Sequence, residues 1–196
     1  MARKAQISKE VILQKALEML IRDGYSSINI KTLSSEIGCS TQPLVWHFGN
    51  MEGLRKALAS YALTYANQKI APSAQDAAEA LAQVVAAYVQ IALREPNLFR
   101  FLYMNSDSSA SLSDNEELKS DDSFGELLRR LAASYQVSGE KIGRYLQHII
   151  IYTHGIASLV VAGIVKASEE EVIQMIRYAD HSFRLKEGIP LEQTPE

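Results

Sequence analysis

The sequence predicts an all-α protein in which a small N-terminal helix-turn-helix domain precedes a larger helical domain. Apolar residues recur at helical spacing along most of the 196 residues. No stretch combines alternating polarity with β-branched residues and flanking turns, as strands would. The ten glycines and five prolines mostly stand where helices would end. These three observations together predict about nine helices.

Composition indicates a soluble globular protein. The hydrophobic fraction of 47% is sufficient for a packed core. No apolar run reaches the roughly 18 residues of a membrane-spanning helix, and the N-terminus lacks the apolar segment of a signal peptide. The single cysteine, Cys39, cannot form an internal disulfide. We therefore expect a cytoplasmic protein with no membrane partner.

The net charge of −3 averages two unlike parts. Residues 1–69 carry nine Lys and Arg against five Asp and Glu, whereas the remainder carries eleven against eighteen. A basic N-terminal part on an acidic body is expected when that part meets a polyanion. The alternative is an ordinary solvated surface, since this density of basic residues is unremarkable.

Capping residues and helix-ending glycines predict four helices in the N-terminal third of the chain. The first helix is expected from about Ser8, a good N-cap, to residue 23, where Gly24 ends it. Two short helices follow, one over residues 30–37 and one that begins after Ser40, which can cap it, and reaches about residue 47. A fourth helix is capped by Asn50. This pattern predicts a DNA-binding domain over residues 1–50 and a connecting helix over residues 51–70.

Residues 71–196 are expected to form the second, larger domain. Its helices are predicted over residues 74–94, 96–103, 122–135, 138–166 and 168–186. Residues 105–122 are rich in Ser, Asp and Glu, which indicates a solvated connector.

Residues 30–49 have the spacing of a helix-turn-helix. Leu33 and Leu44 can pack the two helices together, and Gly38 permits the tight turn. The N-terminal residues of the second helix then face the major groove, where Gln recognises adenine and the Thr methyl packs on thymine. The predicted DNA-binding residues are Arg3, Lys4, Lys31, Thr32, Ser40, Thr41, Gln42, Pro43, Trp46, His47 and Asn50. The alternatives are a small helical bundle with no nucleic-acid role and, for Trp46 and His47, packing against the fourth helix.

Residues 8–67 resemble the TetR (tetracycline-repressor-like) family of bacterial regulators. The resemblance is carried by Asp23-Gly24-Tyr25, by Ile37-Gly38-Cys39-Ser40 and by the run from Leu44 to Phe48. It implies a homodimeric regulator, mostly a repressor, that binds a palindromic double-stranded DNA operator and responds to an unknown small-molecule effector. The second half, residues 71–196, resembles the effector-binding and dimerisation domain of the family. Within it the chain resembles one subclass marked by a Trp-His-Gly triplet, with Thr153 where that subclass has Trp.

Two positions depart from the family pattern. Val45 stands where relatives commonly have Tyr, and Met51 where they have Lys; both usual residues contact DNA phosphates. The resemblance therefore implies that the N-terminal arm and the helix N-termini hold the DNA backbone to a greater extent here.

The second domain offers two further sets of candidates. Aromatic and polar side chains that could line an effector pocket are Tyr88, Phe99, Phe101, Tyr103, Met104, Tyr152 and His154. A four-helix dimer interface, implied mainly by the resemblance, would use Ile149, Ile156, Leu159, Val160, Gly163, Val172, Ile176, Ala179 and Phe183. The alternative for both sets is an intramolecular core.

Nothing in the sequence has the pattern of a catalytic centre. There is no Ser/His/Asp spacing, phosphate-binding loop, glycine-rich cofactor turn or metal-ligand set. We therefore expect neither an enzyme nor a bound cofactor. The rival to a DNA-binding regulator is a helical small-molecule-binding or sensor protein with little or no DNA-binding activity.

Overall fold

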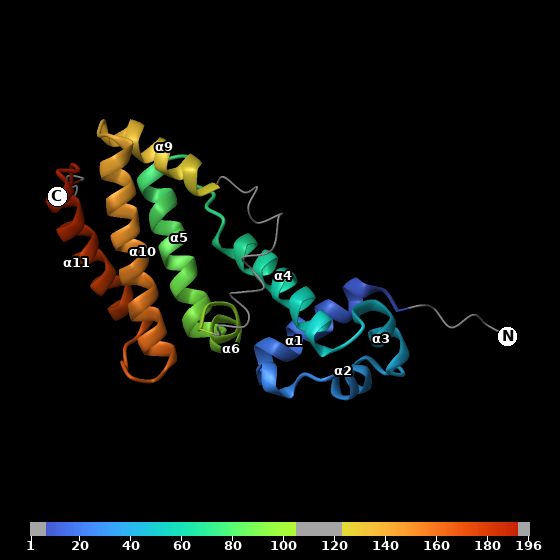
Figure 1. Cartoon of the computed structure of the whole chain (residues 1–196). Coiled ribbons are helices and arrows are strands. Elements are labelled where there is room, and N and C mark those ends of the chain that lie inside the picture. The colour runs from blue at the N-terminus through green and yellow to red at the C-terminus, as the bar shows by residue number, and fades with distance from the viewer. Residues whose placement is uncertain (1–6, 105–122, 192–196) are drawn as a thin grey trace. The chain divides into compact units, whose positions relative to one another are not determined.

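The computed structural model describes residues 7–104 and 123–191, which form two compact units (Figure 1). All regular structure in these ranges is helical and comprises nine α-helices, one 3-10 turn and one π-helical segment. The all-α prediction is therefore confirmed. Arg3, Lys4 and the predicted connector at 105–122 lie outside the described residues. Within those ranges, no helix combines the length and the apolar character that a membrane span requires.

The first unit contains the N-terminal helices. They are α1 (Lys9–Asp23), η1 (Tyr25–Ser27), α2 (Ile30–Ile37), α3 (Gln42–Phe48) and α4 (Met51–Ile70), and the last two residues of α4 are grouped with the second unit. Ile12, Ala16 and Leu20 are fully buried along α1, one helical turn apart. Helices α2 and α3 both contact α1 and each other, so this stripe organises the unit.

The ends of these helices follow from local chemistry. Ser8 Oγ accepts a hydrogen bond from Val11 N at 3.3 Å, as expected of an N-cap. Ser40 does not cap α3, contrary to the prediction. The cap position is Thr41, whose backbone is already helical and whose side chain makes no cap bond. Helix α3 therefore begins at Gln42, and Pro43 in its first turn fits because no intrahelical N–H is needed there.

Two short elements complete the first unit, α6 (Pro96–Phe99) and the π-helical η2 (Arg100–Met104). Asn97 Nδ2 donates to Ile21 O at 3.2 Å, and the Phe101 ring lies 5.0 Å from that of Tyr25. The sequence assigned residues 96–103 to the larger domain, whereas the structure groups them with α1. The described chain therefore crosses between the units twice, at residues 68–69 and 94–95.

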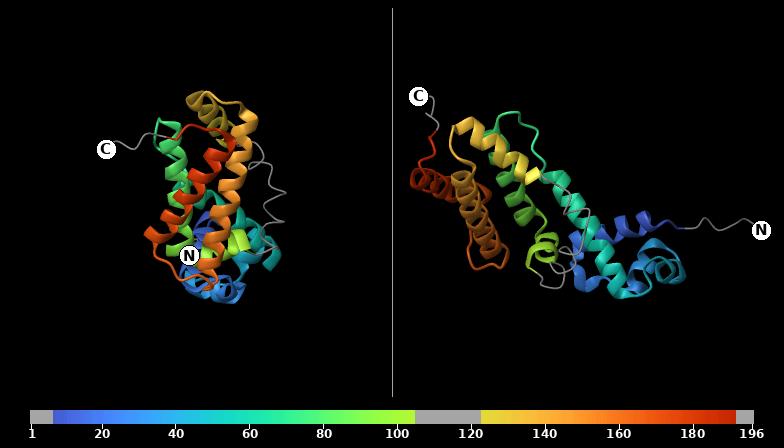
Figure 2. Two further views of the ribbon diagram at one scale, coloured as in Figure 1. Left: turned by 90° about the vertical axis from the view of Figure 1, so that its left-hand side faces the viewer. Right: turned by 45° about the horizontal axis from the view of Figure 1, so that its top comes forward.

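The second unit contains α5 (Ala77–Arg94), α9 (Ser123–Tyr135), α10 (Gly139–Val161) and α11 (Glu169–Glu187). Helices α5, α10 and α11 pack against one another, and α9 packs against α5 and α10 (Figures 1 and 2). The core includes Val89, Ile142 and Leu146. Helix α10 ends at Val161 rather than at residue 166, because Gly163 turns the chain with a φ of 74° and Ile164 N bonds back to Leu159 O.

Hydrogen bonds and ion pairs join α10 to α11. The Arg144 guanidinium donates two hydrogen bonds to Glu187 Oε2, at 3.0 and 2.9 Å, and these bonds lower the pKa of that carboxyl. Deeper in the unit, Tyr145 donates its hydroxyl to Asp180, which also pairs with Arg184 at 3.1 Å. Burial and the Asp180 charge raise the pKa of Tyr145, so its hydroxyl stays protonated. The two helices are therefore held by charge as well as by apolar packing.

Candidate nucleic-acid interface and ligand cavity

The helix-turn-helix has a rigid interior. Leu33 of α2 and Leu44 of α3 are buried, as expected of the residues that pack the two helices together. Gly38 takes the left-handed conformation, with φ 77° and ψ 33°, and Cys39 N bonds to Ser34 O at 2.9 Å. Glycine is needed at this position because a side chain would strain a left-handed backbone. The turn therefore fixes the direction in which α3 leaves α2.

The opposite side of α3 is largely exposed, and on it the Trp46 ring meets that of His47 edge-on at 4.5 Å. Thr41, Gln42 and Val45 are exposed, Pro43 is half-buried, and Trp46 has 68% of its surface accessible. Large exposed apolar groups beside polar ones are typical of contact surfaces. Gln42, Val45 and Trp46 occupy positions 1, 4 and 5 of the helix, so they share one face.

Three predicted DNA-binding side chains make bonds within the chain. Thr32 Oγ1 accepts from Asn29 N at 2.9 Å and so closes the capping box that begins α2. His47 Nε2 lies 2.9 Å from Ile7 O, which ties α3 to the start of the described chain. Asn50 Oδ1 accepts from Gly53 N at 2.9 Å and caps α4. The sequence carried a signal for the first of these, because Asn29 and Thr32 have capping-box spacing.

Lys31 and Ser40 flank this surface. Both are exposed, Lys31 in the first turn of α2 and Ser40 in the turn before α3. They remain predicted DNA contacts, as do Arg3 and Lys4, which lie outside the described residues.

Gly53 is a residue that the sequence analysis missed. A Cβ built on it would lie 2.1 Å from the carbonyl oxygen of Phe48, a distance that no side chain tolerates. The first turn of α4 therefore approaches the end of α3 closely only because position 53 has no side chain. This contact holds α3 against α4.

The second unit contains an apolar cavity of about 210 Å³ between α5, α9 and α10. Its lining residues are Leu81, Val84, Val85, Tyr88, Phe124, Leu127, Leu146, Ile149, Ile150, Thr153 and His154. We refer to it as the α9 cavity. Its polar groups come from α5 and α10: the Tyr88 hydroxyl lies 2.7 Å from His154 Nδ1, and Ser158 Oγ lies 3.4 Å from His154 Nε2.

Thr153 differs from these paired groups. The residue is 4% exposed, and its Oγ1 has no hydrogen-bond partner in the described structure. A buried hydroxyl without a partner is unfavourable, which makes it a candidate contact for a bound molecule.

The predicted effector residues do not all lie together. Tyr88 and His154 meet in the α9 cavity. Phe99, Phe101, Tyr103 and Met104 belong to the first unit, where burial raises the pKa of Tyr103 to about 12. Tyr152 instead packs edge-on against Phe183 at 6.3 Å. The set therefore splits between two units.

The residues predicted for the dimer interface also fall into a buried group and an accessible group. Ile149, Val172 and Ile176 are buried in the core of the second unit and have no surface for a second chain. Leu159 and Gly163 are exposed, and Ile156, Val160, Ala179 and Phe183 are half-buried. The sequence missed three strongly exposed apolar residues on α10 and α11, namely Ile151, Tyr178 and Leu185. Helical periodicity alone did not indicate which stripe of each helix faces inward.

No group of three His, Cys, Asp or Glu side chains within residues 7–104 and 123–191 has the arrangement of a metal site.

Comparison with known proteins identifies the N-terminal segment. Residues 12–58 match the family of bacterial regulatory proteins, tetR family. An uncharacterized HTH-type transcriptional regulator of Mycobacterium tuberculosis is 37% identical over 57 residues, which is 29% of this chain and 26% of that protein. The chain thus spans about a quarter of this curated relative.

Two solved structures resemble nearly the whole chain. A TetR-like transcriptional regulator from Rhodococcus sp. RHA1 superposes with a TM-score of 0.63 at 12% identity, covering 96% of this chain and 99% of the other. A single-substitution variant of TetR from Acinetobacter baumannii AYE, in complex with minocycline, superposes with a TM-score of 0.59 at 17% identity, covering 92% and 96%. At these identities the likeness concerns the fold alone, which is TetR-like.

Proposed function

We propose that this chain is a ligand-responsive TetR-family repressor that acts in the cytoplasm as a homodimer on a palindromic DNA operator. The observation that carries the proposal is the exposed face of α3, where the side chains of Gln42, Val45 and Trp46 lie together. The match of residues 12–58 to the tetR family supports it independently.

DNA recognition is assigned to α3 in the major groove. Gln42, the first residue of the helix, can donate to and accept from one adenine edge. Val45 and Trp46 offer apolar surface to thymine methyl groups and sugars. Val45 has no hydroxyl for a phosphate, so backbone contacts fall to Lys31, Ser40, Thr41 and the N-terminal Arg3 and Lys4.

Effector binding is assigned to the α9 cavity. Its apolar lining and few polar groups are typical of small-molecule sites. The Acinetobacter baumannii TetR variant of similar fold was solved with minocycline. In the proposed Trp-His-Gly subclass the triplet falls on Thr153-His154-Gly155, so Thr153 leaves open a volume that Trp would fill.

A short segment of the chain connects the proposed effector cavity to the DNA-binding helices. Helix α5 lines the cavity and ends at Arg94, and α6 begins two residues later and binds the end of α1 through Asn97. A ligand that favours one position of α5 would bias α1 through this short connection, provided its affinity differs between the two positions.

Dimerisation is assigned to α10 and α11. Ile151, Gly155 and Leu159 are spaced by four residues on α10, and Tyr178 and Leu185 by seven on α11, so each helix carries one stripe. All but the half-buried Gly155 are exposed. Adjacent exposed apolar stripes are typical of helical interfaces between subunits.

Fluorescence anisotropy with DNA from upstream of the gene tests the proposal. We expect saturable binding that weakens steeply with salt, and Gln42→Ala and Trp46→Ala should each reduce affinity by about tenfold. Gln68→Ala, at an exposed glutamine of α4, is the matched control and should bind normally. Replacing Arg3 and Lys4 should weaken binding to all sequences and flatten the salt dependence.

The rival function predicts a different result. A sensor without DNA-binding activity would give no complex at low salt, and substitution of Gln42 would change nothing. That outcome would leave the α9 cavity as the proposed functional site.

A further inference from the structure

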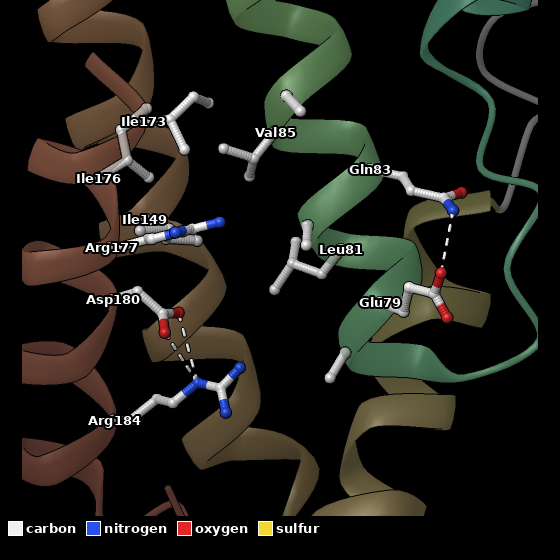
Figure 3. A pocket seen from close by; sticks show the side chains of 13 residues that line it. Glu79, Leu81, Gln83, Val85, Ile149, Ile173, Ile176, Arg177, Asp180 and Arg184 are labelled. Carbon is white, nitrogen blue, oxygen red and sulfur yellow. Dashed lines mark hydrogen bonds and ion pairs between the residues drawn. The ribbon is translucent and has the colours of Figure 1, made fainter. Parts of the chain in front are cut away.

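A second cavity, which we call the α11 cavity, lies between α5, α10 and α11 and holds about 350 Å³ (Figure 3). Its apolar surface comes from Leu81, Val85, Ile149, Ile173 and Ile176. Leu81, Val85 and Ile149 also line the α9 cavity, so the two cavities share these side chains. No part of the proposed DNA-binding or effector role uses the α11 cavity.

The cavity has a cationic group on its α11 side. Figure 3 shows the Arg177 side chain extending from α11 toward Leu81 of α5, beside Ile149. Arg177 is exposed, and within the described residues it forms no hydrogen bond or ion pair. A guanidinium with five donors therefore lies beside an apolar hollow without a protein acceptor.

The nearby carboxylates are engaged elsewhere. Asp180, three residues along α11, accepts from the Tyr145 hydroxyl and pairs with Arg184 at 3.1 Å. Glu79 accepts from Gln83 Nε2 at 3.5 Å, and Figure 3 shows both of these side chains on the side of α5 away from Arg177. Glu169 pairs with Arg94 at 3.0 Å. Glu170 lines a neighbouring hollow together with Arg177 but is exposed. Within the described residues none of these carboxylates forms an ion pair with Arg177, so its positive charge is available to an anion from outside the protein.

The geometry points to the α11 cavity as a binding site for an amphipathic carboxylate, with its apolar tail against Leu81, Ile149 and Ile176 and its carboxylate on Arg177. A carboxylate suits the planar guanidinium because two parallel N–H···O bonds can form. The apolar lining selects against a fully polar anion, because such a ligand would lose its hydration without compensation. This assignment does not rest on the proposed DNA-binding role or on the effector assigned to the α9 cavity.

Isothermal titration calorimetry of the full chain with octanoate tests the assignment. We expect one saturable site, with octan-1-ol and octylamine each bound at least about tenfold more weakly than octanoate. Arg177→Gln should weaken octanoate binding by about tenfold or more. Lys166→Gln removes an equal charge from an exposed position outside both cavities and should leave binding unchanged.

Two further variants locate the site. Ala86 lines only the α11 cavity and Val84 only the α9 cavity. Ala86→Phe should abolish octanoate binding, whereas Val84→Phe should retain it. Equal binding of octanol and octanoate, or full affinity in Arg177→Gln, would overturn the carboxylate assignment. Loss of binding in Val84→Phe with retention in Ala86→Phe would assign the ligand to the α9 cavity, and absence of any saturable binding would reject the site.

Discussion

Thr153 illustrates how one residue can carry a functional signal that fold stability does not explain. Its hydroxyl is buried without a partner while its neighbour His154 is engaged by Tyr88 and Ser158. An unsatisfied buried hydroxyl costs about 1–3 kcal/mol, and Val would have nearly the same shape without that cost. In the proposed effector site, this hydroxyl would be satisfied by a ligand that accepts from it or donates to it.

The substitution Thr153→Val tests this explanation. We expect it to raise the free energy of unfolding of the ligand-free protein by about 1 kcal/mol, because the unsatisfied hydroxyl is removed. Urea denaturation measures the change. Thr64→Val, at an exposed threonine of α4 whose hydroxyl bonds to Ser60 O, is the control and should not stabilise. A destabilised Thr153→Val protein would mean that the hydroxyl has a structural role.

At the scale of elements, the junction of α3 and α4 depends on the absence of a side chain at position 53. The carbonyl of Phe48 occupies the space that a Cβ of residue 53 would need, and Asn50 caps α4 at the same place. Because α3 carries the proposed DNA-binding face, this contact sets how firmly that face is held.

We therefore expect Gly53→Ala to destabilise the protein and weaken DNA binding, although alanine normally favours helices. Gly143→Ala, in α10, meets only an ordinary contact at 3.9 Å with Leu128 and should stabilise by about 0.5–1 kcal/mol. Urea denaturation gives the free energy of unfolding of both variants. The comparison separates the effect of helix propensity from that of the close contact between residue 53 and the Phe48 carbonyl. Stabilisation by both alanines would contradict the close approach at Phe48.

The α10–α11 pairing should depend on pH through Glu187. The bonds from Arg144 lower the folded-state pKa of this carboxyl below its unfolded value. Its stabilising contribution is therefore complete above the unfolded pKa, near pH 4.3, and is lost as pH falls through the folded pKa. The Glu187→Gln variant should therefore lose less free energy of unfolding than the parent protein as the pH falls below about 4.5. Urea denaturation across a pH series measures this difference. Glu10→Gln, at an exposed glutamate of α1, should leave the acid dependence unchanged.

For the whole molecule, the important feature is that the described chain passes twice between the two units. The second passage joins the cavity-lining α5 to α6, which binds the end of α1. In the proposed repressor, linkage is reciprocal, so the effector and the DNA should each lower the affinity for the other by the same factor.

Asn97→Ala tests this passage. Loss of its bonds to α1 should weaken DNA binding several-fold, while ligand binding within the second unit stays unchanged. Anisotropy with operator DNA and calorimetry with octanoate measure the two activities. Asn67→Ala, at an exposed asparagine of α4, is the control. Unchanged DNA affinity in Asn97→Ala would mean that α1 does not depend on α6.

Local signals predicted most helix boundaries. Ser8, Gly24 and Gly38 end or begin helices where their backbone preferences require, and these assignments match the structure. The error at Ser40 arose because a local signal had a competitor: Thr41, not Ser40, takes the cap position of α3. Thr32, His47 and Asn50 each make a bond within the chain, and their DNA contacts stay predictions.

The sequence alone therefore determined that the chain is helical, that residues 30–49 form a helix-turn-helix and that Gln42 and Trp46 lie on its exposed face. These properties depend on residue spacing and on backbone preferences within a few residues. The tertiary structure decided the membership of Phe99 and Phe101 in the first unit, the burial of Ile149 and Ile176, and the two cavities. Which stripe of a helix is buried depends on contacts between residues far apart in the chain, and helical periodicity is the same for a core, a cavity wall and an interface.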